Sequence, residues 1–142
     1  MQAAYEVACN LLPEDLRECT EGHGHDPKFA VLLGAKESDC IYFADPNGTP
    51  AGVAGVGDDG LIWMLCTPLI HKYPVSFARE AKRYIESRNE KLLWNIVDKR
   101  NTTHLKLLKF LGFKFLREFS YGPNQLTFIE FCRGVSISPG SS

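Results

Sequence analysis

The chain has no long apolar run and no excess of charge of one sign. No stretch of its 142 residues approaches the ~18 consecutive apolar residues that a membrane span needs, so we expect no transmembrane helix. The N-terminus, Met-Gln-Ala, has no basic segment followed by an apolar core, which is the mark of a secretory signal. Sixteen Lys and Arg against 17 Asp and Glu give a net charge of −1, which argues against non-specific nucleic-acid binding as the main role.

Several motifs of known chemistry are also missing. The five cysteines are odd in number and irregularly spaced, so we expect free thiols in a reducing cytoplasm rather than a disulfide framework. No phosphate loop or dinucleotide fingerprint occurs. Four ligand-type side chains lie close together at Cys19, His23, His25 and Asp26, but a zinc site usually needs a second pair elsewhere. We interpret that segment as a solvated loop and expect no metal.

The length and composition are those of one globular domain. The chain is 44% hydrophobic and 23% charged, which is ordinary for a folded domain of this size. We place the domain at residues 1–133. Residues 134–142 are rich in Gly, Ser and Pro and read as a flexible C-terminal tail.

The most informative stretch is residues 91–115. Leu92 to Val97 is a short apolar run, as expected of a buried strand. Asn101 offers a side chain that can cap a helix, and apolar residues then recur at helical spacing until Gly112, where a left-handed C-cap is least strained. Phe113 and Phe115 then begin another strand. The stretch therefore predicts a strand–helix–strand unit.

The same reasoning extends to the rest of the chain. We predict strands and helices in the order β, α, α, β, β, β, α, β, α, β, β. The predicted strands lie at residues 4–8, 40–44, 50–56, 61–67, 92–97, 113–120 and 126–132. The predicted helices lie near residues 13–19, 27–35, 74–89 and 102–111. The small residues of the strand at 50–56 indicate a close approach by backbone or ligand.

This pattern resembles the Gcn5-related N-acetyltransferase (GNAT) fold over residues 4–132. The residues that carry the likeness in the C-terminal half are Leu93, Val97, Asn101, Leu105, Leu108, Leu111, Gly112 and Phe113. The resemblance implies an α/β (α+β) domain with a mixed central sheet of about six to seven strands and helices on both faces. It also implies acetyl-CoA as cofactor and transfer of its acetyl group to an amine.

In the GNAT fold the end of the fourth strand holds the pantetheine arm, and the next helix start binds the pyrophosphate. Backbone N–H groups at a helix start suit such an anion. The resemblance implies cofactor contacts at Leu65, Cys66, Thr67, Val75, Ser76, Phe77 and Asn101. Asn101 and His104 would flank the thioester, and His104 is the candidate acid or base. The alternative interpretation is that Asn101 is a helix cap and that His104 is a buried helix residue with a satisfied hydrogen bond.

The chain departs from the GNAT pattern at two places. The turn at residues 67–77 contains no glycine, although the family has a glycine-rich turn there. Leu108 occupies the position at which the family has the tyrosine that acts as general acid. The strands flanking the site offer only Cys66, Thr67, Asn95 and Asp98 as further polar groups, and we expect Asp98 to be exposed in its loop and Cys66 to be a buried structural thiol.

A second resemblance covers residues 60–132. The run from Trp94 to Phe115, with the aromatic segment 119–133, is similar to a group of small proteins of short-tailed (podovirus-type) bacteriophages, the internal virion protein A group, which is tied to virion assembly. This resemblance implies a protein made late in the cytoplasm of a host bacterium and associated with the virion. Its partner would be a phage or host protein.

Two functions therefore stay open. One is a diverged, non-catalytic GNAT-fold protein that serves virion assembly through protein contacts. The other is an acetyl-CoA-dependent N-acetyltransferase.

An open sheet edge at residues 126–132 would allow a homodimer. The basic residues around the last helix are more typical of a solvated face than of a nucleic-acid site; they are Lys99, Arg100, Lys106, Lys109, Lys114 and Arg117.

Overall fold

The N-terminal quarter of the protein is helical. The structure, a computed structural model, describes residues 2–37 and 39–134. Its first elements are α1 (Gln2–Cys9), α2 (Pro13–Arg17), a π-helical turn η1 (Glu18–Gly22) and α3 (Pro27–Glu37). Pro13 is the first residue of α2, and Glu14 and Asp15 lie in its first turn. Acidic side chains are stabilised there by the positive end of the helix dipole.

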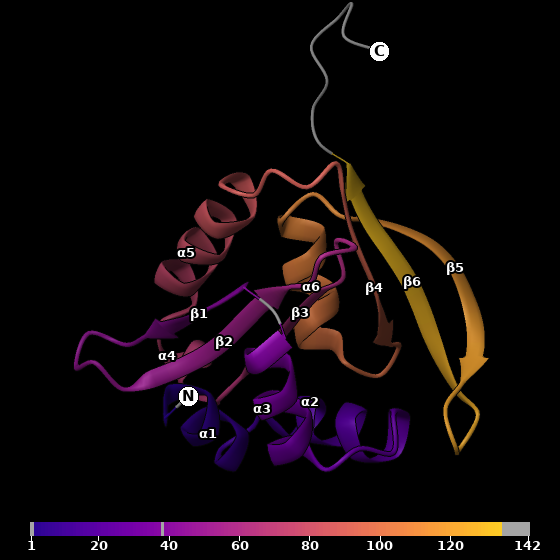
Figure 1. Ribbon diagram of the computed structural model, residues 1–142, viewed down its shortest axis with the longest axis horizontal. Helices are drawn as coiled ribbons and strands as arrows, with labels where there is room; N and C mark the ends of the chain where they lie inside the picture. Colours follow the sequence, from indigo (N-terminus) through magenta and orange to yellow (C-terminus); the bar gives the residue numbers. More distant parts are fainter. Residues whose placement is uncertain (1, 38, 135–142) are drawn as a thin grey trace, which may run out of the picture.

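Two antiparallel sheets of three strands follow (Figure 1). The first has the order β1–β2–β3, with β1 (Asp39–Ala44), β2 (Pro50–Val56) and β3 (Ile62–Cys66). The second has the order β4–β6–β5, with β4 (Leu92–Asp98), β5 (Lys114–Tyr121) and β6 (Leu126–Gly134). The helices between them are α4 (Leu69–Lys72), α5 (Pro74–Glu86) and α6 (Thr102–Phe110).

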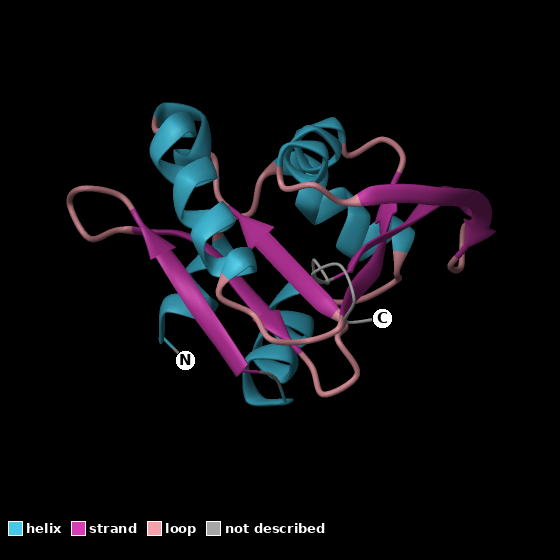
Figure 2. Cartoon of the chain, turned by 90° about the horizontal axis from the view of Figure 1, so that it is seen from above, coloured by secondary structure: helices cyan, strands magenta, loops and turns pink. Residues whose placement is uncertain are grey.

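The two sheets meet at one point. Leu61 and Trp94 form an isolated parallel bridge between the start of β3 and β4, and the N–H of Trp94 donates to the carbonyl of Gly60 at 3.1 Å. Within the described part of the chain, no further strand pairing joins β3 to β4. This parallel bridge between antiparallel sheets makes the arrangement mixed, and helices lie on both sides of the strands (Figure 2). The predicted fold class is confirmed.

The core lies in two clusters on opposite faces of the first sheet. The larger cluster joins β1–β4 and β6 to α5 and α6, with Phe43 stacked on Phe77 at 5.4 Å between ring centroids. The smaller cluster packs α1 and α3 onto β2. At Gly55 of β2 the close neighbour is a side chain and not the predicted backbone or ligand, because a Cβ there would lie 2.7 Å from the Trp63 ring.

The strand predicted at residues 4–8 is wrong, because these residues belong to α1. Ala4, Val7 and Ala8 are its buried residues, and their i, i+3, i+4 spacing places them on one helical face. That face packs against α3 and β2. The segment between the strand predicted at residues 61–67 and the helix predicted near residues 74–89 contains the short helix α4, and α5 ends at Glu86 rather than at residue 89.

The edge of the second sheet is β5, not the last strand. β6 pairs with β4 on one side and β5 on the other, so the open edge predicted at residues 126–132 is wrong. β6 continues to Gly134, and the rest of the predicted tail, residues 135–142, lies outside the described residues. Among the residues that are described, no helix has the length and apolar character to cross a membrane.

Candidate functional site

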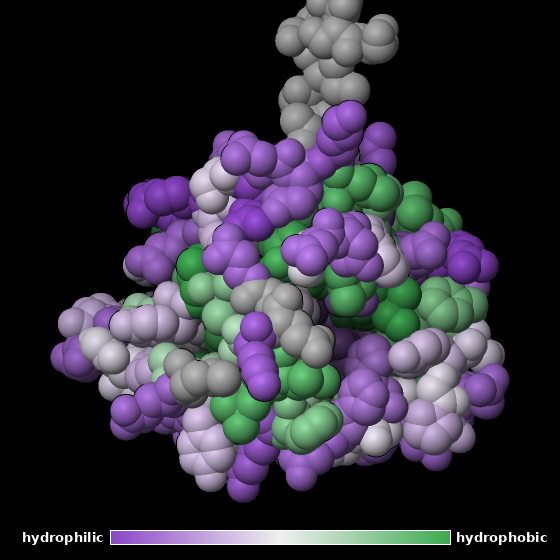
Figure 3. All heavy atoms as spheres, viewed as in Figure 1, coloured by the Kyte–Doolittle hydropathy of each residue, from purple (hydrophilic) through white to green (hydrophobic). Residues whose placement is uncertain are grey.

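A cavity of about 600 Å³ lies where β3 and β4 separate. Its walls come from α3, β3, β4 and α6 and are mostly apolar, with Trp63, Met64 and Trp94 among the lining residues. Glu18, His23 and His104 add polar groups. Figure 3 shows apolar residues gathered around a hollow near the middle of this face. An apolar cavity with a few polar groups is the usual form of a small-molecule site.

The edge of β3 that faces β4 is largely occupied by other parts of the chain. At its C-terminal end, the N–H of Cys66 donates to Asp15 Oδ2 at 2.8 Å, and the carbonyl of Cys66 accepts from the N–H of Leu12 at 2.9 Å. Nearer the bridge, Asn95 Nδ2 donates to the carbonyl of Ile62 at 2.6 Å. Met64, between them, has no backbone partner among the described residues on this edge.

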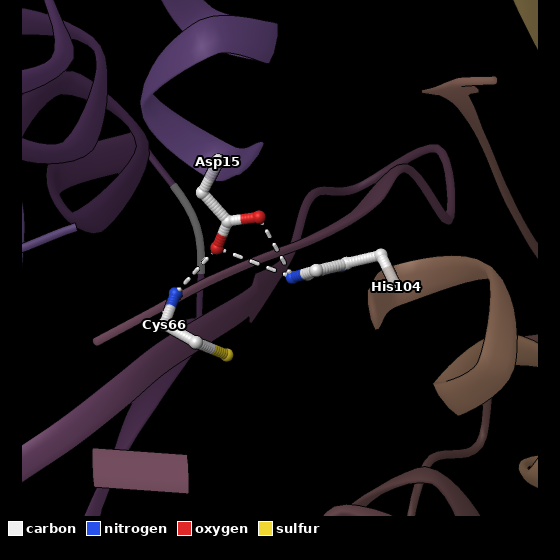
Figure 4. A group of neighbouring side chains, drawn as sticks. All are labelled: Asp15, Cys66 and His104. Carbon is white, nitrogen blue, oxygen red and sulfur yellow. Dashed lines mark hydrogen bonds and ion pairs between the residues drawn. The ribbon is translucent and has the colours of Figure 1, made fainter. Parts of the chain in front are cut away.

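Asp15, Cys66 and His104 form a buried cluster from three elements (Figure 4). Asp15 is 1% exposed, Cys66 0% and His104 9%. His104 Nε2 lies 3.1 Å from Asp15 Oδ1 and 3.2 Å from Asp15 Oδ2. One ligand-type atom from each of the three residues lies within 4.8 Å of the other two. The cluster ties α2 and α6 to the end of β3.

The ionisation of this cluster follows from burial and from Asp15. Burial by itself lowers the pKa of His104, but the adjacent Asp15 carboxylate outweighs it and holds that pKa well above its usual range. Burial raises the pKa of the Cys66 thiol. At neutral pH, therefore, His104 is an imidazolium paired with Asp15, and Cys66 is a neutral thiol. A general acid or base works best with a pKa near the working pH, so His104 is poorly matched to that role.

Asn101 is both a helix cap and a bridge between carboxylates. Its Oδ1 accepts from the N–H of His104 at 3.2 Å, which caps α6. Its Nδ2 donates to Asp15 Oδ1 at 2.9 Å and to Glu18 Oε1 at 3.3 Å. Asn101 is 1% exposed. Its side chain therefore holds the start of α6 against α2 and η1.

Glu18, in the cavity wall, is suited to proton transfer near neutral pH. Its Oε1 accepts from the N–H of Asp98 at 2.8 Å, and its side chain is 17% exposed. Burial raises the pKa of Glu18 to about 7, although the positive charge of His104 opposes the rise. His23 Nε2 lies 4.0 Å from Glu18 Oε2, and His23 Nδ1 lies 3.3 Å from the Tyr121 hydroxyl.

Asp98 is buried, not exposed as the sequence predicted. It is 1% exposed, and its carboxylate accepts from Arg100, with Nη2 at 2.8 Å from Oδ2. Burial alone would raise the pKa of Asp98, but the hydrogen bonds from Arg100 bring it below its usual value. Arg100 also donates to Glu21. Part of the predicted basic face is therefore paired with acids, since Lys99 and Arg117 also lie beside Glu118 and Glu130.

The predicted cofactor site has two halves, the end of β3 and the start of α5. They differ in exposure and in which backbone N–H groups remain free. Leu65 lines the cavity, whereas Cys66 and Thr67 are buried and their N–H groups donate to Asp15 and to Ala51. At the start of α5, Val75 and Ser76 are exposed. Phe77 is buried, and its N–H donates to the carbonyl of Tyr73, so this amide is not free for a phosphate.

No protein-family model and no curated protein sequence matches the chain. Solved structures do match. The ribosomal-protein-S18-alanine N-acetyltransferase from Escherichia coli aligns with a TM-score of 0.66 and 14% identity, over 99% of this chain and 91% of that one. A GNAT-family acetyltransferase from Bordetella pertussis has a TM-score of 0.58 and 13% identity, over 84% and 86%.

The fold is that of the GNAT acetyltransferases. A variant of the spermidine N-acetyltransferase from Vibrio cholerae also aligns, with a TM-score of 0.57 and 9% identity over 76% of this chain and 75% of that one. Identities this low carry the fold and not the activity. The chain is thus acetyltransferase-like in architecture, with the cavity at the point where the two sheets of the GNAT fold separate.

Sequence reasoning found three members of the buried network, Cys66, Asn101 and His104, and missed the two carboxylates beside them, Asp15 and Glu18. Asp15 and Glu18 lie three positions apart on consecutive helical turns, so they face the same side. That spacing was the available signal. The spacing indicates a site only together with Asn101, and it is the fold that brings Asn101 into contact with both carboxylates.

Proposed function

We propose that this chain is a diverged GNAT-fold protein that acts through protein contacts, without catalysis, in the assembly of a short-tailed bacteriophage particle. The observation that carries the proposal is the occupied strand edge. In the GNAT fold the pantetheine arm of acetyl-CoA binds the end of the strand equivalent to β3. Here Leu12 and Asp15 take both backbone hydrogen bonds of Cys66 at that end.

The start of α5 supports the same proposal. The turn that precedes it contains no glycine and holds the helix α4 instead. Pro74 has no N–H to offer, and that of Phe77 is already used, so two of the first four residues of α5 cannot serve an anion. A pyrophosphate would find only the amides of Val75 and Ser76.

The phage setting is supported by the resemblance of residues 60–132 to small podovirus proteins. It implies expression late in infection, in the bacterial cytoplasm, and association with the virion. Mass spectrometry of purified particles of the encoding phage tests this part. We expect the protein in particles that withstand a density gradient and high salt. Its absence from such particles, with abundant protein in the infected cell, would restrict it to the cytoplasm.

Calorimetric titration of the full chain with acetyl-CoA, with CoA as comparison, tests the loss of the cofactor site. We expect no binding at millimolar concentration of either compound. Micromolar binding that Ser76→Glu abolishes and Ser120→Glu leaves intact would contradict the proposal. Ser76 lies at the start of α5 and Ser120 on β5, and both are exposed, so the pair separates a local charge effect from a general one.

A second candidate is an acetyl-CoA-dependent N-acetyltransferase that modifies an amine on a host or phage protein or on a small molecule. The cavity favours it, because Glu18 could accept a proton there from an incoming ammonium group. Acetyl transfer to a panel of polyamines and peptide N-termini tests it. Activity that falls at least 100-fold in Glu18→Gln, with unchanged acetyl-CoA affinity, would establish this function in place of the first.

A further inference from the structure

Asp15, Cys66 and His104 bring three kinds of metal ligand to one place. Carboxylate oxygen, thiolate sulfur and imidazole nitrogen are the side-chain ligands that zinc takes in proteins. They come from α2, the end of β3 and α6, and they lie within 4.8 Å of one another. We propose that these three residues form a zinc site with its fourth coordination position directed at the cavity. Such a site would exist whether or not the protein binds acetyl-CoA.

The arrangement matches a metal centre and not a catalytic relay. In a Cys–His–Asp relay, the thiol and the carboxylate lie at opposite nitrogens of the imidazole ring. Here Nε2 of His104 faces both carboxylate oxygens of Asp15, and Figure 4 shows the Cys66 sulfur near the same end of the ring. The ligand atoms of all three residues therefore lie within 4.8 Å of one another, around the position that a single ion would occupy.

The distances between His104 and Asp15 fit zinc with little movement. Zinc–nitrogen and zinc–oxygen bonds of about 2.0–2.1 Å at a tetrahedral angle place the two ligand atoms about 3.3 Å apart. His104 Nε2 lies 3.1 Å and 3.2 Å from the two Asp15 oxygens. For this pair an outward shift of a few tenths of an ångström is sufficient. The Cys66 sulfur lies within 4.8 Å of the other two ligand atoms and would have to come to about 3.6 Å from each of them, which a rotation of its side chain can supply. A thiolate in the set favours zinc over magnesium or calcium, which prefer oxygen ligands alone.

The surroundings hold the ligands and balance the charge. Asn101 Nδ2 and the N–H of Cys66 each donate to a different oxygen of Asp15, as second-shell groups fix a ligating carboxylate. On binding, zinc would replace one proton on His104 Nε2 and one on the Cys66 sulfur. The ion's two positive charges then equal the negative charges of Asp15 and the Cys66 thiolate. The buried centre is neutral, which lowers the cost of burying it.

The direction of the fourth coordination position follows from the exposure of the three ligands. Asp15 and Cys66 are fully buried, whereas His104 lines the cavity. Three protein ligands with one open position are typical of zinc sites that bind water or a ligand, because closed structural sites have four. The fourth ligand would be a water molecule or a donor atom of the molecule that occupies the cavity.

Metal analysis of the full chain is the first test. Protein expressed with added zinc and dialysed against zinc-free buffer should hold one zinc ion per chain. Cys66→Ala should reduce this at least tenfold. Cys19→Ala is the matched control, because Cys19 is also buried but is not part of the cluster, and it should keep its zinc.

Cobalt substitution gives a readout that does not depend on the folding of Cys66→Ala. Cobalt added to metal-free protein should produce the visible bands of tetrahedral cobalt and a near-ultraviolet band from a sulfur–cobalt bond. A variant that retains Cys66 but has Ala at Cys9, Cys19, Cys40 and Cys132 should show both. Wild-type protein without zinc and without either band would overturn the proposal and leave an Asp15–His104 ion pair only.

Discussion

The carboxylate of Asp15, on the second helix, accepts a hydrogen bond from the backbone N–H of Cys66, 51 residues later, at 2.8 Å. A strand edge needs a partner for each buried N–H and C=O group, and another strand usually supplies them. Here a side chain supplies the acceptor, and Leu12 supplies the donor for the carbonyl of Cys66. The N-terminal helices therefore close the end of β3, while the rest of the cleft stays open as the cavity.

Removal of the Asp15 carboxylate should be costly. Asp15→Ala would leave the Cys66 N–H, an amide N–H of Asn101 and the charged imidazolium of His104 without their acceptor in the interior. Loss of one partner of a buried ion pair costs about 3–5 kcal/mol, so we expect the free energy of unfolding to fall by that amount in urea denaturation. Glu14→Ala, one residue earlier, should cost about 1 kcal/mol because it removes one partly buried bond to Thr103. Equal effects would contradict the central role of Asp15.

Glu18 should make the protein less stable as the pH rises. Its pKa is about 7 in the folded protein, against an ordinary value of 4.5. Below pH 4.5 the carboxyl is protonated in both states. Between pH 4.5 and 7 the unfolded chain loses the proton first, so ionisation favours unfolding, and above pH 7 the full cost remains. The difference in pKa corresponds to a loss on the order of 3 kcal/mol.

Denaturation of wild type and Glu18→Gln from pH 4 to 8, with a chelator present, measures this loss. Gln keeps an acceptor for the Asp98 N–H and cannot ionise, so the variant should gain stability over wild type as the pH rises and match it near pH 4. The other groups that face Glu18 are Asp15, His23 and His104, and they remain in both proteins. A difference that does not vary with pH would show that Glu18 ionises normally.

Gly60 should be far less replaceable than Gly48. Both have φ of +84°, so alanine is strained at either position. A Cβ on Gly60 would lie 2.1 Å from the carbonyl oxygen of Leu92, whereas nothing lies within 4 Å of one on Gly48. We expect Gly48→Ala to cost about 1 kcal/mol through backbone strain alone, and Gly60→Ala at least about 2 kcal/mol more because it separates β3 from β4. Thermal denaturation of the two variants measures both costs. Similar melting temperatures would refute the close packing of Gly60 against the Leu92 carbonyl.

Asn101→Asp should destabilise the protein more than Asn101→Ala at neutral pH. Aspartate caps a helix as well as asparagine does, but its charge would lie beside the carboxylates of Asp15 and Glu18. Alanine removes the cap and the two bridging bonds, at about 2 kcal/mol. The excess cost of Asp should shrink as the pH falls and the carboxylates protonate. The opposite order at pH 7 would mean that Asn101 acts only as a cap.

Local features of the C-terminal half were predictable from sequence. The strand at residues 92–98, the cap at Asn101, the helix to Phe110 and the positive φ of Gly112 each depend on residues within a few positions of one another. The error at residues 4–8 has a local cause. Five residues are too few to separate alternation from helical spacing, and the buried Ala4, Val7 and Ala8 follow the helical one.

The site depended on contacts between distant residues. Asp98 was predicted to be exposed because it follows a strand, but the arrival of η1 beside β4 and the hydrogen bonds from Arg100 allow the carboxylate to be buried. Glu18 likewise has a raised pKa only because the cavity wall removes water from it. Burial and partner choice for ionisable groups are set by packing, which no short window of sequence contains.

By itself, then, the sequence determined the single domain, the strand–helix–strand unit with its cap and glycine stop, and the likeness to the GNAT fold, because backbone preferences and hydrophobic periodicity act over short distances. Only the tertiary structure decided that Asp15, Cys66 and His104 share one point and that the first helices occupy the edge of β3. Those relationships join residues 38 or more positions apart, and the free energy that holds them comes from burial and charge pairing that exist only once the elements have packed.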